Sequence, residues 1–162
     1  MTVREPQDAD FDALATLTNH YIATTAIHFG YEPIGAGELH AQWRDARERF
    51  PWRVADDGGA AIGYAKAGVW RARAAYQWTC ELGVYVAPEA IGRGAGGALY
   101  AALLDACKQR GFRSAVAGIT LPNPASVALH ERFGFVPAGV IAQAGFKHGT
   151  WHDVAFFQKL FV

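Results

Sequence analysis

The chain has 162 residues, of which 51% are hydrophobic, and its 15 basic and 15 acidic side chains give a formal net charge of zero. This length predicts one domain, residues 1–162, with a substantial core, and the neutral balance disfavours disorder and a nucleic-acid partner. The N-terminal MTVREPQDADF has no apolar run, and no segment reaches the roughly 20 apolar residues of a membrane span, so we expect neither a signal peptide nor membrane insertion.

The first half of the chain is predicted to contain a short strand, two helices and a hairpin. Residues 2–4 form the strand, and the first helix begins at an N-cap, Asp8, and runs to about Ile22 with apolar residues at helical spacing. A loop leads to a second helix over roughly 36–49, whose apolar side carries Leu39 and Trp43. The hydrophobic period then becomes that of strands, and WRVADD and AAIGYAKAGVW are predicted to form a hairpin that turns at residues 57–59.

The second half alternates predicted strands with helices. YQWTCELGVYVAP is a strand that ends at Pro88, and a glycine-rich turn leads into a helix that Gly111 stops. RSAVAGI is a buried strand, PASVALHERFGF is a short helix that ends at Gly134, and FVPAGVIAQAGF and TWHDVAFFQKLF are the closing strands. The order indicates an α/β fold with mixed connections, in which hairpins come first and a strand–helix–strand unit lies in the middle.

The glycine-rich turn contains Gly92, Gly94 and Gly97 in the spacing G-x-G-x-x-G. A dinucleotide fingerprint is excluded because APEAI separates the strand from Gly92 and no acidic residue follows about 20 positions later, and no Gly-Lys-Ser/Thr follows as in a P-loop. Such a turn still exposes backbone N–H groups to an anion, and Arg93 could add charge. On spacing alone, an anion site and a merely flexible turn are equally good interpretations.

The segment GRGAGGAL, residues 92–99, resembles the acetyl-CoA pyrophosphate loop of the GCN5-related N-acetyltransferases (GNATs), whose motif is Q/R-x-x-G-x-G/A. Four more segments resemble the phosphinothricin and methionine sulfoximine acetyltransferase branch: NHYIATTAIHF, AYQWTCELGVYVAP, LPNPASVALHERFGF and AGFKHGTWHDVAFFQ. The resemblance covers nearly the whole chain in order, although Ile91 and Gly92 depart from the loop motif. It implies the GNAT fold, a mostly antiparallel sheet of about seven strands with splayed central strands and about four flanking helices.

The resemblance also implies an activity. The expected enzyme is an acetyl-CoA-dependent N-acetyltransferase that acts by direct transfer, in a ternary complex, on the α-amino group of phosphinothricin, methionine sulfoximine, methionine sulfone or a similar small molecule. Two alternatives are a peptide or protein N-acetyltransferase of the same fold and a non-catalytic acyl-CoA-binding module that could dispense with Glu81. A homodimer is implied as well, and WHDVAFFQKLF could supply its interface or equally belong to the core.

Two residues are the catalytic candidates. An amine must lose a proton before it attacks a thioester, and a carboxylate can assist through ordered water. The bare sequence favours a solvent-facing strand residue for Glu81, but the resemblance reverses this, because the matching glutamate is the general base there. His130 stands where many relatives have a tyrosine that protonates the departing thiolate, so the resemblance implies a general acid; a histidine packed on a helix surface is the alternative.

Three groups of residues match coenzyme-binding positions of the family. The backbone of a splayed strand binds the pantetheine arm, and one of its N–H groups can polarise the thioester carbonyl. Asn123, between two prolines, is also explained by turn chemistry. The matching residues are the strand Val84, Tyr85 and Val86, the loop Gly92, Arg93, Gly94, Ala95, Gly96 and Gly97, and the pair Asn123 and Ser126.

On the acceptor side, Phe29, Arg71 and Arg73 are candidate substrate contacts, because a substrate carboxylate binds a guanidinium well; surface solvation is the alternative for the two arginines. The aromatic residues Trp70, Tyr76 and Trp78 are expected in the core. His148 and His152 lie in a predicted hairpin without further ligands, so no metal is expected. Cys80 and Cys107 are predicted to be reduced core thiols of a cytoplasmic protein.

Overall fold

The computed structural model describes residues 1–162 and contains one sheet of seven strands in the order β1-β2-β3-β4-β5-β7-β6. All neighbouring strands are antiparallel except β4 and β5, which are parallel. This arrangement confirms the predicted mixed order and the strand–helix–strand unit. The strands are β1 (Thr2–Arg4), β2 (Trp52–Asp57), β3 (Ala60–Val69), β4 (Thr79–Val86), β5 (Ser114–Thr120), β6 (Val136–Lys147) and β7 (Thr150–Leu160).

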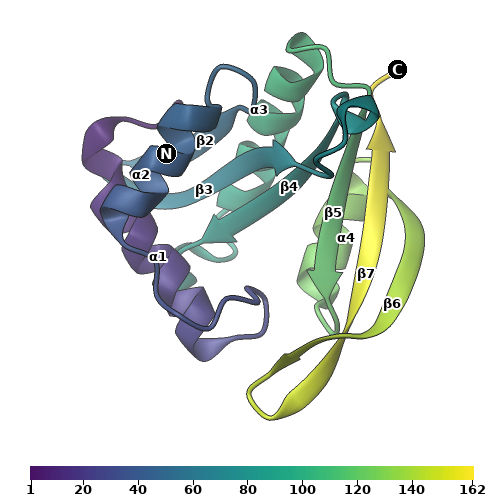
Figure 1. Ribbon diagram of the computed structural model, residues 1–162. Coiled ribbons are helices and arrows are strands. Elements are labelled where there is room, and N and C mark those ends of the chain that lie inside the picture. The colour runs from purple at the N-terminus through teal and green to yellow at the C-terminus, as the bar shows by residue number, and fades with distance from the viewer.

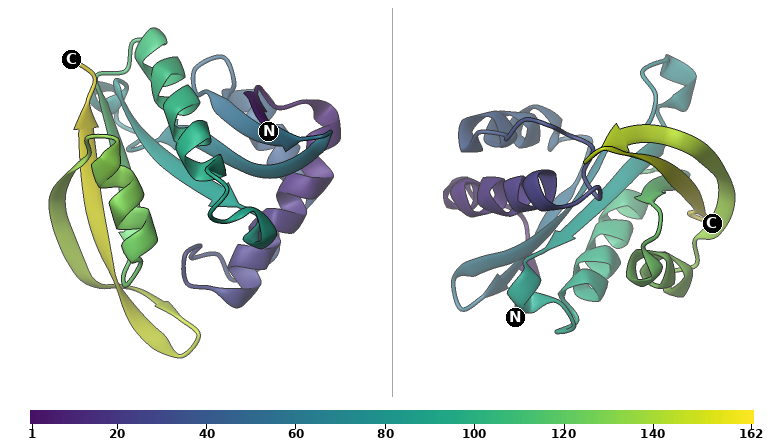
Figure 2. Two further views of the ribbon diagram at one scale, coloured as in Figure 1. Left: turned by 180° about the vertical axis from the view of Figure 1, so that it is seen from behind. Right: turned by 90° about the horizontal axis from the view of Figure 1, so that it is seen from below.

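Helices cover both faces of the sheet (Figure 2). On one face lie α1 (Phe11–Thr24) and α2 (Ala36–Ala46), and on the other α3 (Ala95–Gln109) and α4 (Pro124–Arg132). Successive residues of β3 face opposite layers, since the Tyr64 hydroxyl contacts the Thr18 hydroxyl of α1 while Gly63 backs onto Leu99 of α3. None of the helices is long and apolar enough to cross a membrane.

The predicted turns and helix ends are found where glycine adopts positive φ angles. Gly58 and Gly59, with φ of 64° and 91°, turn the β2–β3 hairpin, and Gly111 and Gly134, with φ of 83° and 82°, follow α3 and α4. Glycine suits these positions because it lacks the Cβ that makes the left-handed region costly. The element boundaries predicted at these glycines are therefore confirmed.

Two predicted boundaries are wrong. Asp8 does not cap α1: it opens a short 3₁₀ helix (Asp8–Asp10), and its carboxylate lies 2.9 Å from Nε2 of His40 in α2. Asp10, the residue before α1, binds the Arg4 side chain instead of capping the helix. The third long strand also begins later than predicted, because Ala74–Tyr76 form a 3₁₀ turn ahead of β4.

The two halves of the sheet separate between β4 and β5. Residues Thr79–Glu81 of β4 pair with Ser114–Val116 of β5, and beyond this point β4 pairs only with β3 and β5 only with β7. Figure 1 shows the two strands diverging after their short common segment. The splayed central strands expected from the resemblance are thus confirmed, and Glu81 is the last β4 residue before the gap.

The long β6–β7 hairpin is tied to the loop that follows α1. Lys147, at the end of β6, is buried and donates hydrogen bonds of 2.5 and 2.6 Å to the carbonyl oxygens of Ile22 and His28. The Tyr31 hydroxyl donates to the Phe146 carbonyl oxygen. These contacts hold the hairpin across one end of the gap between β4 and β5.

Candidate active site

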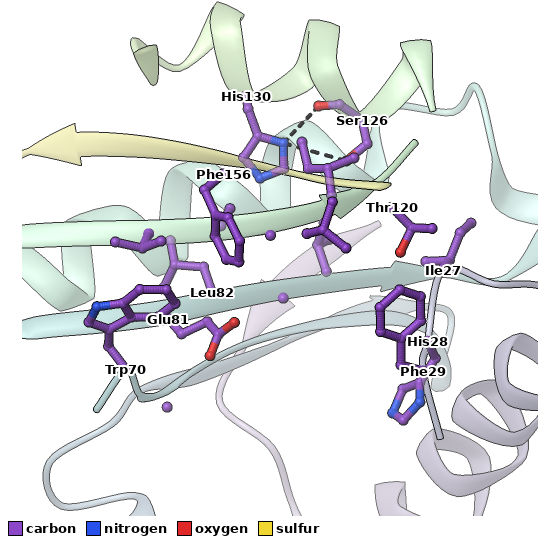
Figure 3. A pocket seen from close by; sticks show the side chains of 18 of the residues that line it. Ile27, His28, Phe29, Trp70, Glu81, Leu82, Thr120, Ser126, His130 and Phe156 are labelled. Atoms are coloured by element: carbon purple, nitrogen blue, oxygen red, sulfur yellow. Dashed lines mark hydrogen bonds between the residues drawn. The ribbon is translucent and has the colours of Figure 1, made fainter. Parts of the chain in front are cut away.

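A cavity of about 950 Å³ follows the gap between β4 and β5. Its walls come from β3, β4, β5, the β6–β7 hairpin, α3, α4 and the loop after α1, so it reaches both faces of the sheet. Figure 3 shows Glu81 beside Trp70, His130 beside Ser126, and His28 beside Phe29 around this space. Of the predicted site residues, the cavity brings together Phe29, Arg71, Glu81, Val84, Tyr85, Asn123, Ser126 and His130.

Glu81 is half-buried in the cavity wall at the closed end of the gap. Burial raises the pKa of its carboxyl group above the ordinary value, and the positive charges of Arg71 and Lys66 act in the opposite direction. A raised pKa makes the carboxylate a stronger base than an exposed glutamate. The position and environment of Glu81 therefore suit proton removal from a bound amine.

The backbone of β4 offers hydrogen-bonding groups to the gap. The Ala87 N–H donates to the Ile62 carbonyl oxygen on β3, so by alternation the backbone groups of Val84 and Val86 point away from β3. The Val86 carbonyl oxygen already accepts a hydrogen bond of 2.6 Å from the Tyr21 hydroxyl. Val84 lines the cavity with its neighbour Tyr85, whereas Val86 does not.

The glycine-rich turn leads directly into α3. Gly92 and Gly94 have φ of 82° and 84°, and a Cβ on either would meet no atom within 4 Å, so the outer side of the turn is open. Arg93 contributes its charge elsewhere, because its guanidinium lies 2.6 Å from the Asp57 carboxylate. The turn lies outside the residues that line the cavity and next to its α3 side.

A second arginine approaches this turn from α4. A Cβ on Gly97 would lie 2.5 Å from Nη2 of Arg132, so this guanidinium rests against the first turn of α3. Arg132 forms no ion pair with a carboxylate of the chain. A cation beside a helix N-terminus is favourable only when an anion joins them. Arg132 was not predicted from the sequence, since only the packing of α4 against α3 brings it to the loop.

His130 is buried, with only 3% of its surface exposed, and its ring packs against Tyr100 of α3. Its Nδ1 lies 2.7 Å from the Ser126 carbonyl oxygen, which can only accept, so Nδ1 carries the proton and Nε2 accepts from the Tyr100 hydroxyl. Burial lowers the pKa of His130, and the Ser126 hydrogen bond opposes this. Both ring nitrogens of the neutral imidazole are therefore engaged, which leaves no free N–H for a departing thiolate.

Asn123 has two functions at the start of α4. Its side-chain oxygen accepts a hydrogen bond of 3.2 Å from the Ser126 N–H and so caps the helix, as turn chemistry predicts. Asn123 and Ser126 also line the cavity. The capping bond fixes the side of α4 that faces the cavity.

The acceptor side of the cavity differs in part from the predictions. Arg71 lines it and stacks on Trp70 at 4.2 Å, and Phe29 packs against Gly145 of β6. Arg73 is not brought to the cavity; it lines a separate depression beyond the end of β3. The prediction that the aromatic residues here are core is wrong for Tyr76 and Trp78, which are 46% and 50% exposed because the chain between β3 and β4 projects from the sheet.

Two basic residues of the cavity wall, His28 and Lys66, were not predicted from the sequence. Burial lowers the pKa of both, and the Glu81 charge acts in the opposite direction on Lys66. Lys66 is the one charged residue of the otherwise apolar strand β3, and that isolated charge is the signal by which the sequence could have identified it.

Two further predictions were that the cysteines are reduced core thiols and that the two histidines of the last hairpin bind no metal. Cys80 and Cys107 are buried and unbonded, with their sulfur atoms 3.9 Å apart, which confirms the core thiols. His148 and His152 each contact a backbone carbonyl oxygen, and no group of three or more His, Cys, Asp or Glu residues is placed to hold a metal ion.

Comparison with known proteins matches the acetyltransferase (GNAT) family model to residues 14–135. A phosphinothricin N-acetyltransferase from Streptomyces viridochromogenes is 43% identical over 159 residues, 98% of this chain and 87% of that protein. An L-methionine sulfoximine/L-methionine sulfone acetyltransferase from Salmonella typhimurium is 34% identical over 98% of this chain and 93% of that protein. The crystal structure of a phosphinothricin acetyltransferase from Sinorhizobium meliloti with acetyl-CoA superimposes with a TM-score of 0.94 at 35% identity, covering 98% of this chain and 87% of that chain. These similarities confirm the resemblance identified in the sequence segments.

Proposed function

The chain belongs to the acetyltransferase (GNAT) family, and from this premise we propose that it transfers the acetyl group of acetyl-CoA to the α-amino group of a small amino-acid-like substrate. The observation that carries the proposal is the position of Glu81, a partly buried carboxylate at the point where β4 and β5 separate, inside a cavity open to both faces of the sheet. The similar proteins act on phosphinothricin, methionine sulfoximine and methionine sulfone, which are small molecules with an α-amino and an α-carboxylate group.

The residues of this chain fit acetyl-CoA, which supplies the acetyl group as a thioester. The N–H groups that follow Gly94 at the start of α3, together with the Arg132 guanidinium, suit the diphosphate. The Val84 backbone in the gap suits the pantetheine arm, with Asn123 and Ser126 on the opposite wall. The open side of the turn leaves room for a diphosphate to approach the backbone.

Each step of the proposed reaction has a residue that supports it. Glu81 accepts a proton from the substrate ammonium group, directly or through water, so that the neutral amine can attack. A backbone N–H of β4 in the gap donates to the thioester oxygen as negative charge develops there. Neither cysteine lines the cavity, which supports direct transfer in a ternary complex and not an acetyl-cysteine route.

We propose that His130 positions α4 relative to α3 and does not itself react. Its Nδ1–H is bonded to the Ser126 carbonyl oxygen and its Nε2 to the Tyr100 hydroxyl, so it connects α4 to α3 across the coenzyme side of the cavity. The general-acid prediction for His130 requires one of these bonds to open during the reaction. The Ser126 hydroxyl, 3.5 Å from Nδ1, and water are the simpler proton donors to the departing sulfur.

The acceptor side of the cavity favours a small substrate over a peptide. The β6–β7 hairpin is held over it by Lys147, and Phe29 packs under Gly145 of the same hairpin. An extended peptide would have to displace these contacts. A non-catalytic binding module would have no use for a base at Glu81, so its presence in the cavity favours catalysis.

We also propose that the chain forms a homodimer through β6 and β7. The edge strand β6 is 12 residues long and exposed along most of its length. A long exposed edge with apolar side chains is favourable for pairing with a second copy. Large apolar residues exposed on these two strands are Val136, Val140, Ile141, Phe146, Trp151 and Leu160.

A thiol-release assay with acetyl-CoA tests the function most simply. We expect release with methionine sulfone, methionine sulfoximine or phosphinothricin, and little release with unstructured peptides that carry a free N-terminus. Release with peptides but with none of a full panel of amino acids and their analogues would contradict the proposal and favour a peptide acetyltransferase.

A further inference from the structure

On the acceptor side of the cavity, two glycines, Gly68 and Gly83, lie between the side chains of Lys66 and Glu81. On the face of the sheet that carries Tyr64, Lys66 of β3 stands opposite Gly83 of β4, and Gly68 of β3 stands opposite Glu81. A Cβ on Gly68 would meet no atom within 4 Å, so the space above this patch is open. Lys66 and Glu81 are therefore diagonal neighbours with no side chain between them.

The Lys66 ammonium group is unpaired. It lines the cavity and is partly buried, and its one specific contact is with the ring of Trp52, whose centroid lies 5.1 Å from Nζ. Glu81 acts on it through space without forming an ion pair. A partly desolvated cation of this kind gains most from an anion that enters the cavity.

We propose that Lys66 binds the carboxylate of the acceptor, so that an α-amino acid lies across Gly68 and Gly83 with its amine at Glu81. The assignment rests on the proposed function and narrows the substrate to zwitterionic amino acids. The register supports this arrangement, because Lys66 and Glu81 are diagonal cross-strand neighbours, which lie about 7–8 Å apart at the strands, and a long lysine side chain can turn from Trp52 to a carboxylate held above Gly83.

The same patch explains the selection of amino acids over other small amines. An amine without a carboxylate leaves Lys66 unpaired beside the substrate, which costs binding energy. A side chain at position 83 or 68 would stand where the substrate backbone lies. Arg71 is less well placed for this carboxylate, because it is exposed and stacked on Trp70 beyond the Glu81 end of the patch.

The test compares a carboxylate acceptor with its neutral counterpart. The value of kcat/KM is measured for L-methionine sulfone and for L-methionine sulfone carboxamide with the wild type, Lys66→Met, Lys66→Arg and Arg71→Met. Methionine keeps the length and the apolar contact with Trp52 but removes the charge. Lys108→Met, which removes an exposed lysine at the far end of α3, is the matched control.

We expect Lys66→Met to lower the acid-to-amide ratio of kcat/KM by about 10- to 100-fold, mostly through KM. Lys66→Arg should restore most of the ratio, and Lys108→Met should leave it unchanged. Any effect of Lys66 on the basicity of Glu81 affects both acceptors and cancels in the ratio. Affinity for acetyl-CoA, measured by calorimetry, should stay the same in all variants and shows that each is folded.

Two results overturn the assignment. If Lys66→Met keeps the wild-type ratio, or if Arg71→Met alone abolishes it, the carboxylate is bound elsewhere and only this inference fails. If the wild type acetylates neither acceptor nor any other amino acid, the proposed function itself is wrong. The wild-type rates therefore separate the two failures.

Discussion

At the scale of single residues, burial shifts the pKa values of Glu81 and His130 in the cavity, and the shift of Glu81 suits catalysis. Burial raises the pKa of Glu81 and lowers that of His130, so both groups resist carrying charge. For Glu81 this increases proton affinity, which a general base needs. For His130 it stabilises the neutral ring, whose two nitrogens hold Ser126 and Tyr100.

The neutral state of His130 predicts a pH-dependent stability. Because its folded pKa is below the ordinary 6.5, the unfolded chain binds the proton first, and stability is lost as pH falls through 6.5 toward the folded pKa. We therefore expect the fall in Tm below pH 6.5 to be smaller in His130→Gln than in the wild type. At alkaline pH the variant should be less stable by about 1–2 kcal/mol, because the Tyr100 hydroxyl loses its partner.

Thermal unfolding from pH 5 to 8, about 1.5 units on either side of the ordinary histidine pKa, measures this difference. His28 is partly buried and also has a lowered pKa; it contributes in both proteins, so the comparison with the variant isolates His130. An identical fall in Tm in the two proteins, or NMR signals of a protonated His130 ring above pH 7, would contradict the assignment.

At the scale of elements, the coenzyme side combines the end of one helix with the side of another. The turn at Gly92 and Gly94 opens α3, and Arg132 reaches its first turn from α4. The sequence predicted this turn and the helix boundary, because glycine spacing and helix periodicity are local signals. It could not predict Arg132 or the Arg93–Asp57 pair, since both depend on how elements pack.

Arg132→Gln is expected to weaken acetyl-CoA binding about 5- to 30-fold, because a cation beside the helix N-terminus is lost. The effect should be largest at low salt, where exposed charges are least screened. Calorimetry at low and at physiological ionic strength measures it, with Arg44→Gln on the exposed side of α2 as a matched control. Equal affinities of the Arg132 and Arg44 variants at both salt concentrations would exclude Arg132 from the coenzyme site.

At the scale of the whole molecule, the sheet consists of two halves that share only three paired positions between β4 and β5. The alternating and helical patterns predicted nearly every element, and the resemblance predicted the splay. Composition and periodicity alone could not predict the splay, because they describe one strand at a time. The loss of hydrogen-bonded pairing beyond Glu81 depends on how β4 and β5 lie relative to each other. For the same reason Arg71 and Arg73, close in sequence, were both assigned to the substrate, although only Arg71 lines the cavity.

The exposed β6–β7 hairpin leads to a prediction about assembly. The wild type should sediment with about twice the chain mass of 17.5 kDa, and Val140→Glu should shift it to the monomer, since a charge would enter an apolar interface. Val162→Glu, at the 94% exposed C-terminal residue, is the control and should stay dimeric. A monomeric wild type at micromolar concentration would contradict the proposed dimer.

The most direct test of the account is the rate of Glu81→Gln with saturating acetyl-CoA and methionine sulfone across pH. We predict a loss of about 10²- to 10⁴-fold in kcat, with acetyl-CoA affinity preserved and without the acidic limb that the Glu81 carboxyl group gives the wild type. Because burial raises the pKa of Glu81, its charge is unfavourable in the fold at neutral pH, and the variant should be at least as stable as the wild type. A variant that acetylates methionine sulfone at the wild-type rate with an unchanged pH profile would contradict the role of Glu81 as the base.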